Sequence, residues 1–251
     1  YDINLLDLAC GKGGDIYKWN RNKLSECVGI DISPDNIHND ENGAIKRYRS
    51  LKEGSSSVPD MEFRVLDTSQ NINETFDDLI DKRFDIIAVM FALHYFFKDI
   101  DSLNGLIKNI EQHIKVDGYF IGACFDGDIL YNKLKRASDN ILNFDMGGQT
   151  LLKIEQLYLQ DHEFVANDTS LGMGIDVEMY SIGGKHTEYL VNFEYFIQLL
   201  RERGIELVDK VDFRDMSAPS TTDNKRLRLG KMNIVEKEMS NLNTLFIFKK
   251  I

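Results

Sequence analysis

The stretch Ile3–Lys18, INLLDLACGKGGDIYK, constrains the fold of this chain more than any other. Residues Ile3–Asp7 have the apolar character of a strand, Gly11–Gly14 are rich in glycine, and a helical pattern begins at Asp15. Glycines suit such a turn because the backbone bends sharply and a ligand can approach where no Cβ stands. The free N–H groups at the start of the helix favour an anionic part of that ligand. The stretch therefore predicts a site for a nucleotide-like cofactor.

The spacing of the glycines separates two classes of cofactor. The dinucleotide fingerprint G-x-G-x-x-G would place its third glycine at position 16, where this chain has Ile16. An acidic residue at the strand end, here Asp7, followed by spaced glycines is typical of S-adenosylmethionine (SAM) sites. A structural glycine turn without a ligand is the alternative at this point.

Two later strands are also expected to end in carboxylates. Asp31 closes a short apolar run and lies twenty positions beyond Gly11, where α/β folds place an acceptor for both ribose hydroxyls. Asp67 follows the predicted strand Met61–Leu66 and could accept from the exocyclic amine of an adenine. These positions favour an adenosine ligand without choosing between NAD and SAM.

The rest of the chain alternates strand and helix patterns. A strand at Arg83–Phe91 is hydrophobic along its whole length, as a central parallel strand should be. Repeated strand–helix units predict an α/β fold with a doubly wound, mostly parallel sheet. The other expected elements are a helix from Ser33 to about Arg49, a loop at Lys52–Asp60, one helix within Gln70–Lys82, helices at Leu103–Ile114 and Ile129–Ile141, a strand at Tyr119–Phe125, strands near Leu151–Leu159 and Asp176–Ile182, a helix ending near Arg203, and strands at Ile205–Val211 and Leu245–Lys249.

The chain of 251 residues fits one α/β domain. We expect residues 126–187 to form an insertion that covers the site as a lid, and the polar residues 214–243 to form a mobile loop. The chain begins at Tyr1, close to its first strand, and this suggests a domain cut from a longer polypeptide.

Composition limits the partners. The net charge of −11 argues against a broad basic surface for nucleic acid, so any RNA contact should be local or lie on another domain. No apolar run approaches the length that spans a membrane, and no secretory leader opens the chain. Cys10, Cys27 and Cys124 lack metal-ligand spacing, so we expect buried, reduced thiols and no metal site.

Five motifs together resemble the mRNA cap guanine-N7 methyltransferases: DLACGKGGDIYKW at Asp7–Trp19, GIDIS at Gly29–Ser33, FALHY at Phe91–Tyr95, DGYF at Asp117–Phe120 and HTEYLVNF at His186–Phe193. Two more are most similar to the methyltransferase domains of capping enzymes from large DNA viruses: FDGD at Phe125–Asp128 and ELVDKVDF at Glu206–Phe213. The resemblance covers nearly the whole chain. It implies the class I, Rossmann-like fold of SAM-dependent methyltransferases.

The resemblance also implies a set of site residues. The cofactor contacts would be Ala9, Gly11, Asp15, Asp31, Asp67, Thr68, Met90 and Tyr95. The cap contacts would be Lys12, Lys18, Arg47, His94 and Glu188. The family usually has Gln where this chain has Met90, and its C-terminal tyrosine is matched only by Leu242–Asn243.

The implied reaction transfers a methyl group from SAM to N7 of the cap guanosine, a nitrogen that carries no proton. No acid or base residue is therefore expected, and His94, Tyr95 and Glu188 would position the base. Glu188 would accept from the guanine N1–H and N2–H₂ groups, while the three basic residues would hold the triphosphate bridge. For Lys18 and Arg47, an ordinary solvated helix charge is the alternative, and Glu188 could instead pair with Lys185.

Two other functions stay open at this stage. One is methylation of another RNA or of a small molecule on the same fold, and the other is a non-catalytic, methyltransferase-like activator subunit. The expected partners are the 5′ cap of mRNA, triphosphatase and guanylyltransferase domains on the same polypeptide, and an activating subunit. The viral resemblance implies a cytoplasmic replication site or the virion, and otherwise the nucleus is expected.

Overall fold

The computed structural model describes residues 2–55, 57–181, 183–216 and 232–251. Its core is a seven-stranded sheet in the order β10-β11-β5-β4-β1-β2-β3. All neighbouring strands are parallel except the pairs that contain β11, which runs against both β5 and β10. The strands are β1 (Asn4–Asp7), β2 (Glu26–Asp31), β3 (Asp60–Val65), β4 (Phe84–Met90), β5 (Ile114–Phe125), β10 (Ile205–Asp212) and β11 (Asn243–Lys250). The predicted doubly wound, mostly parallel sheet is confirmed.

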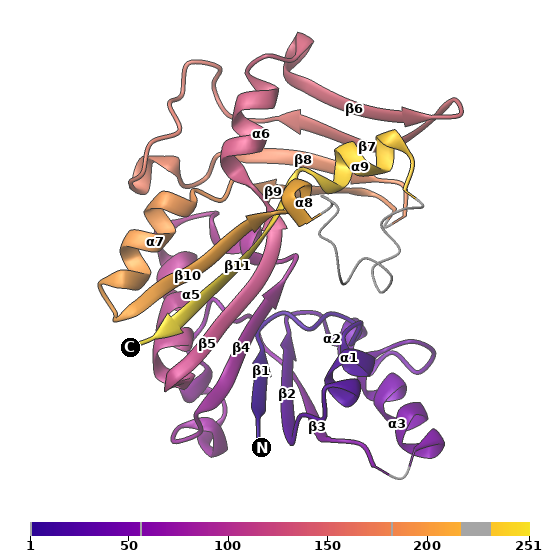
Figure 1. The fold of residues 1–251 in the computed structure, drawn as a ribbon, viewed down its shortest axis with the longest axis vertical. Coiled ribbons are helices and arrows are strands. Elements are labelled where there is room, and N and C mark those ends of the chain that lie inside the picture. The colour runs from indigo at the N-terminus through magenta and orange to yellow at the C-terminus, as the bar shows by residue number, and fades with distance from the viewer. Residues whose placement is uncertain (1, 56, 182, 217–231) are drawn as a thin grey trace.

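Helices cover both faces of this sheet. One group lies beside β1, β2 and β3, and a second lies beside β4, β5 and β10 (Figure 1). The first group is α1 (Ile16–Arg21), α2 (Pro34–His38) and α3 (Ala44–Gly54); the second contains α5 (Ile100–His113) and α7 (Phe193–Arg201), with the short α4 (Leu93–Phe96) after β4. Phe84, Phe120, Phe196, Phe246 and Phe248 are fully buried in the core between these layers. Burial on both sides explains why the central strands are apolar along their length.

A second, smaller sheet stands beyond the carboxyl ends of β1, β2 and β4 (Figure 1). It is antiparallel, in the order β6-β7-β8-β9. It consists of β6 (Ile141–Met146), β7 (Gln149–Gln156), β8 (Gly174–Met179) and β9 (Lys185–Tyr189), and α6 (Gly127–Leu134) and α9 (Ile234–Ser240) pack with it. Most of this unit falls within residues 126–187, where the sequence predicted an insertion, but α9 reaches it from the C-terminal part of the chain.

Several element predictions were wrong, each for a local reason. The expected helix from Ser33 to Arg49 is two helices, because the Asn39 side chain accepts from the N–H groups of Glu41 and Asn42 and turns the chain before α3. The expected loop at 52–60 is shorter, since α3 continues to Gly54 and β3 begins at Asp60.

The single helix expected within 70–82 is also absent. Two short 3₁₀ turns, at Ile72–Glu74 and Asp77–Leu79, lie there instead. The buried Asn109 of α5 accepts from the Ile72 N–H and donates to the carbonyl groups of Thr68 and Gln70. These tertiary hydrogen bonds satisfy the backbone in a conformation that is not an α-helix.

The smaller sheet was predicted least well. The helix expected at 129–141 ends at Leu134, and the unpredicted β6 begins at Ile141. The unpredicted β9 contains Glu188, and none of its five residues is buried, so its sequence KHTEY lacks an apolar run. Within the stretch 214–243, the structure shows α8 (Phe213–Met216) and α9, while residues 217–231 lie outside the described part of the chain.

Candidate active site

The glycine loop after β1 is held against the end of β2 by Asp31. One carboxylate oxygen of Asp31 accepts from the Gly11 N–H at 2.8 Å, and the other accepts from the Ser33 N–H and the Asn36 side chain, both at 2.9 Å. Asp31 is buried. Each carboxylate oxygen can accept more than one hydrogen bond, so Asp31 can also receive hydroxyl groups of a ligand.

Gly13 fixes the shape of the same loop. Its φ is +70°, which L side chains rarely adopt, and an added Cβ would lie 2.4 Å from Cδ1 of Ile16. Gly11 also has a positive φ, of +54°, but a Cβ there would meet no atom within 4 Å. Gly13 therefore allows the loop to pack on α1, while the space beside Gly11 opens toward the neighbouring cavity.

That first cavity has a volume of about 610 Å³ and lies at the carboxyl edge of the large sheet. Seven of the eight predicted cofactor residues line it: Ala9, Gly11, Asp31, Asp67, Thr68, Met90 and Tyr95. Asp15 does not line it, because its carboxylate pairs with Lys18 at 2.5 Å. The lining residues that were not predicted from the sequence include Ile32, Asn36, Ser69, Lys98, Ser102 and Tyr189.

Thr68 ties two walls of this cavity together. Its hydroxyl donates to the carbonyl of Leu8 at 2.7 Å, so the end of β3 is fixed to the end of β1. The neighbouring Asp67 is half buried, and one of its oxygens accepts from the Ser69 N–H. The cavity thus has carboxylates from two adjacent strand ends, and Lys98 is the one basic side chain among its described lining residues. This arrangement suits an adenosine with a charged tail.

A second cavity, of about 480 Å³, adjoins the first and lies under the small sheet. His94 and Glu188 line it, with His94 Nε2 and Glu188 Oε2 3.6 Å apart. That distance is too long for a hydrogen bond. Both atoms are buried, and neither has a hydrogen-bond partner in the described part of the chain. An unpaired buried polar atom is costly, and a polar ligand in this cavity would satisfy both atoms.

Burial sets the charge state of the pair. It lowers the pKa of His94 to about 3 and raises the pKa of Glu188 from 4.5 to about 7. The imidazole is therefore neutral at neutral pH, and the contact is not an ion pair. Lys185, the alternative partner considered for Glu188, pairs instead with Asp176 and Glu155.

The two cavities share a wall. Phe91 lines both of them, has a positive φ of +54° and is 56% exposed. His94 faces the second cavity while the next residue, Tyr95, faces the first, and their rings meet edge to face with centroids 4.2 Å apart. In β9, Glu188 lines the second cavity and Tyr189 lines the first, because successive side chains of a strand point to opposite sides.

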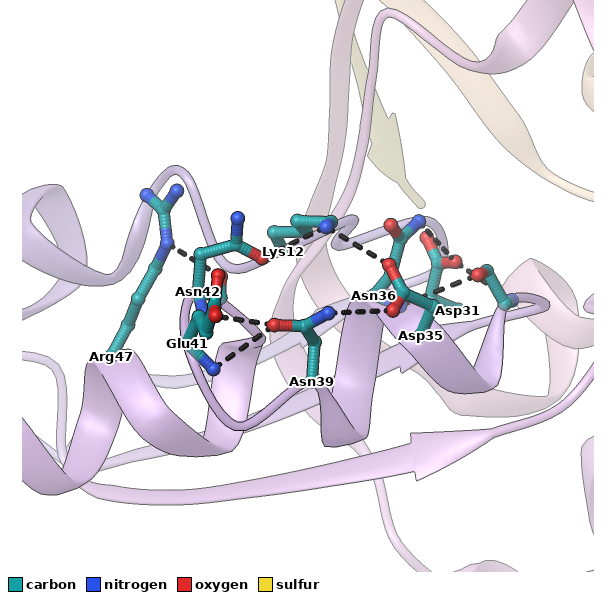
Figure 2. Close-up of polar contacts among 9 residues, drawn as sticks. Lys12, Asp31, Asp35, Asn36, Asn39, Glu41, Asn42 and Arg47 are labelled. Carbon is teal, nitrogen blue, oxygen red and sulfur yellow. Dashed lines mark hydrogen bonds and ion pairs between the residues drawn. The ribbon is translucent and has the colours of Figure 1, made fainter.

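The three predicted cap-binding cations line neither cavity. Lys12 donates to the Asn42 side chain and pairs with Asp35, and Arg47 donates to the carbonyl of Asn42, so that both cations lie on one side of α2 and α3 (Figure 2). Lys18 pairs with Asp15, and its side chain is 74% exposed. The structure therefore brings Lys12 and Arg47 to the same residue, Asn42, but leaves Lys18 on the solvent face of α1.

Comparison with known proteins decides the family. The sequence matches the mRNA (guanine-N(7))-methyltransferase domain over residues 1–250. The chain belongs to this family.

Relatives of this family member come from a virus, from fungi and from a nematode. The chain is 27% identical over 229 residues to a "Probable mRNA-capping enzyme" of Acanthamoeba polyphaga mimivirus, which covers 82% of this chain and 19% of that protein. It is 29% identical over 220 residues to the mRNA cap guanine-N(7) methyltransferase of Saccharomyces cerevisiae, covering 83% of this chain and 47% of the yeast protein. The chain thus spans about a fifth of one relative and about half of the other.

Solved structures support the fold. A SAM-dependent methyltransferase from Clostridium acetobutylicum superposes with a TM-score of 0.60 at 19% identity, over 99% of this chain and 84% of that one. A putative SAM-dependent methyltransferase from Listeria monocytogenes gives a TM-score of 0.56 at 16% identity. The cap guanine-N7 methyltransferase domain described here therefore has the class I, Rossmann-like methyltransferase fold.

One wall of the second cavity was not predicted from the sequence. Glu236, Met239 and Ser240 of α9 line it, together with Asn243 at the start of β11. A sequence signal for α9 was present, since Asn233 and Glu236 form a capping box. The family's C-terminal tyrosine is matched here only by Leu242–Asn243, so an asparagine lines the second cavity at this position.

The remaining predictions concern the cysteines, metal ions and membrane spans. Cys10, Cys27 and Cys124 are free and buried, as predicted, and burial raises the pKa of all three thiols. Among the described residues, no group of three His, Cys, Asp or Glu side chains could hold a metal ion. No helix in the described ranges is both long and apolar enough to cross a bilayer.

Proposed function

We propose that this domain transfers a methyl group from SAM to N7 of the guanosine that caps mRNA. The observation that carries the proposal is the pair of adjoining cavities that share Phe91 as a wall. The first has the strand-end carboxylates that suit adenosine. The second has His94 Nε2 and Glu188 Oε2, which have no hydrogen-bond partner among the described residues. Family membership supports the same reaction.

The first cavity would hold the cofactor. Asp31 would accept the ribose hydroxyls while keeping its bonds to the glycine loop, and Asp67 would accept from the adenine amine. Met90 lines this cavity where the family usually has Gln, so any polar contact there would come from the Met90 backbone. Bound SAM supplies a methyl group on a positively charged sulfur. Tyr95 and Tyr189 would separate that group from bulk water.

The second cavity would hold the guanine. Glu188, when ionised, would accept from N1–H and N2–H₂, two donors that guanine presents together and adenine does not. His94 would face the O6 side as a neutral imidazole. Guanine N7 has a lone pair and no proton, so no side chain has to remove one. Alignment of the two ligands across the shared wall would lower the barrier, an effect that can reach roughly 7–11 kcal/mol.

Glu188 would also act on the charge that moves during transfer. The positive charge leaves the sulfur and develops on the guanine ring, whose N1–H becomes a stronger donor. A carboxylate that accepts this N–H binds the charged ring better than the neutral one, and such differential binding accelerates a reaction. His94 would stay uncharged next to that ring, because burial holds its pKa at about 3.

The test begins with titration of SAM and then of a capped dinucleotide, GpppA, into the purified domain. Methyl transfer to GpppA is expected, more slowly to the inosine analogue, which lacks the N2 amine, and scarcely at all to the adenosine analogue. A domain that binds SAM but methylates none of these acts on another acceptor. A domain that binds neither ligand is a non-catalytic activator.

Glu188→Gln tests the acceptor pocket directly. It should lower the rate of GpppA methylation at least tenfold and leave SAM affinity close to normal, because Glu188 lines only the second cavity. The matched control is Glu178→Gln, an exposed position on the adjacent strand β8. Methylation at the parental rate by Glu188→Gln, or equal loss of SAM and cap affinity, would show that the carboxylate is structural.

The surrounding polypeptide is part of the proposal. The mimivirus relative is named as an mRNA-capping enzyme, and the matched region covers 19% of it. We propose that this domain works beside triphosphatase and guanylyltransferase domains on one polypeptide, and that an activating subunit can join it. The site of action would be cytoplasmic for a viral protein and nuclear otherwise.

A further inference from the structure

The turn between α2 and α3 has a tightly specified geometry. The Asn39 side chain accepts from the N–H groups of Glu41 and Asn42 at 3.0 and 3.1 Å. Gly43 closes the turn, and a Cβ there would lie 2.7 Å from backbone atoms of Asn39. The turn therefore holds Asn42 in one place, above the start of α3.

Asn42 joins two cations from distant parts of the sequence. Its side-chain oxygen accepts from Nζ of Lys12 at 2.8 Å, and its carbonyl accepts from Nε of Arg47 at 3.0 Å (Figure 2). Lys12 also pairs with Asp35 at 2.9 Å, and Asn39 donates to the same carboxylate at 2.7 Å. Lys12, Asp35, Asn39 and Asn42 thus form a closed ring of polar contacts, with Arg47 attached at Asn42.

The ring leaves donors free for an anion. Lysine has three N–H donors, and Lys12 uses two of them in the ring. Arginine has five, and Arg47 uses only Nε within the described part of the chain. The four N–H groups at the end of its guanidinium form the fork that binds phosphate oxygens in pairs. Lys12 directly follows Gly11 in the chain, and Gly11 lines the first cavity, so the glycine loop connects Lys12 to that cavity.

We propose that Asn42 is a positioning residue that holds Lys12 and Arg47 as one unit for the triphosphate bridge of the cap. This inference rests on the proposed function. Lysine carries a point charge on a flexible four-carbon stem, so an unheld ammonium would lose conformational freedom when it binds. Asn42 is neutral, so it orients Lys12 without adding to the negative charge of Asp35, which already pairs with Lys12. With a net charge of −11, the chain as a whole repels phosphates, and pre-ordered local cations must overcome this.

The first experiment compares Asn42→Ala with the parental domain on GpppA. The KM for GpppA should rise about 3- to 10-fold, the loss of one positioning hydrogen bond, while kcat and the Kd for SAM stay unchanged. Competitive inhibition by guanosine, which has no phosphates, should be unaltered. The control is Asn132→Ala, an exposed asparagine on α6 that contacts neither Lys12 nor Arg47.

A double-mutant cycle with Lys12→Ala then separates positioning from general damage. If Asn42 acts through Lys12, adding Asn42→Ala to Lys12→Ala should change the KM for GpppA less than twofold. Equal effects in both backgrounds, weaker inhibition by guanosine, or a parental KM in Asn42→Ala would overturn the inference. If the parental domain itself fails to methylate GpppA, the proposed function is what fails, so the two failures are distinguishable.

Discussion

Replacing Glu188 by glutamine should make the free domain more stable while it damages methylation. The Glu188 side chain is only 12% exposed, and its Oε2 has no hydrogen-bond partner among the described residues. Burial raises its pKa, and no charged group in the described part of the chain opposes this effect. Glutamine has nearly the same shape and no charge, so it removes the cost of keeping an ionised carboxylate in this cavity.

The size of the gain follows from the pKa. The pKa rises from 4.5 to about 7, and each pKa unit corresponds to about 1.4 kcal/mol. Ionised Glu188 therefore reduces the free energy of unfolding by about 3 kcal/mol at pH 8. Glu188→Gln should recover an amount of that order, which for a domain of this size corresponds to a rise in the melting temperature of roughly 6–12 °C.

The stability that Glu188→Gln gains over the parental domain depends on pH. Because the pKa of Glu188 is higher in the folded state, the folded chain binds more protons than the unfolded chain between about pH 4.5 and pH 7. Stability from this group therefore falls as the pH rises through that window. The advantage of Glu188→Gln should be full at pH 8 and fall below about 1 kcal/mol at pH 5.

Denaturant unfolding of the ligand-free domain at pH 5 and pH 8 measures this directly. Glu178→Gln, at an exposed position on β8, serves as the control and should change stability little at either pH. A gain below about 1 kcal/mol at pH 8, or the same gain at both pH values, would refute the electrostatic reasoning. The expected result would show that stability is given up here for ligand recognition.

Three further predictions follow from the site. Asp31→Ala should weaken SAM binding about 10- to 100-fold by calorimetry. It should also loosen the glycine loop, because Asp31 accepts from the Gly11 N–H. Unchanged SAM affinity would show that Asp31 is not a cofactor contact. The kcat/KM for GpppA should rise with pH through about 7 as Glu188 ionises. The rate of single-turnover methyl transfer at saturating ligands should instead stay constant across neutral pH. A bell-shaped pH profile of that rate would contradict this prediction. Gly13→Ala should destabilise the domain by about 1–3 kcal/mol in thermal unfolding, since it combines a positive φ with contact to Ile16, and parental stability would argue against the loop geometry.

The sequence by itself determined the large sheet and the strand-end carboxylates of the first cavity. Strands such as Phe84–Met90 are buried on both faces, so their apolar runs are visible without a structure. Parallel strands bring their carboxyl ends to one edge, so Asp31 and Asp67 could be placed together from chain order alone. Ser33 and Pro34 similarly marked the start of α2 through local hydrogen bonding and backbone restriction.

The tertiary structure decided the second cavity and the state of its groups. β9 has no buried residue and pairs, among the described strands, with β8 alone, so nothing in its own pattern marked it as a strand. α9 reaches the cavity from the far end of the chain. Asn42 accepts hydrogen bonds from both Lys12 and Arg47, and these contacts depend on the turn between α2 and α3. The side-chain contacts of that turn cannot be read from the sequence. The pKa values of His94 and Glu188 come from burial, which depends on which segments pack over them. Short-range patterns fix elements and strand ends, whereas burial and long-range contacts exist only once the chain has folded.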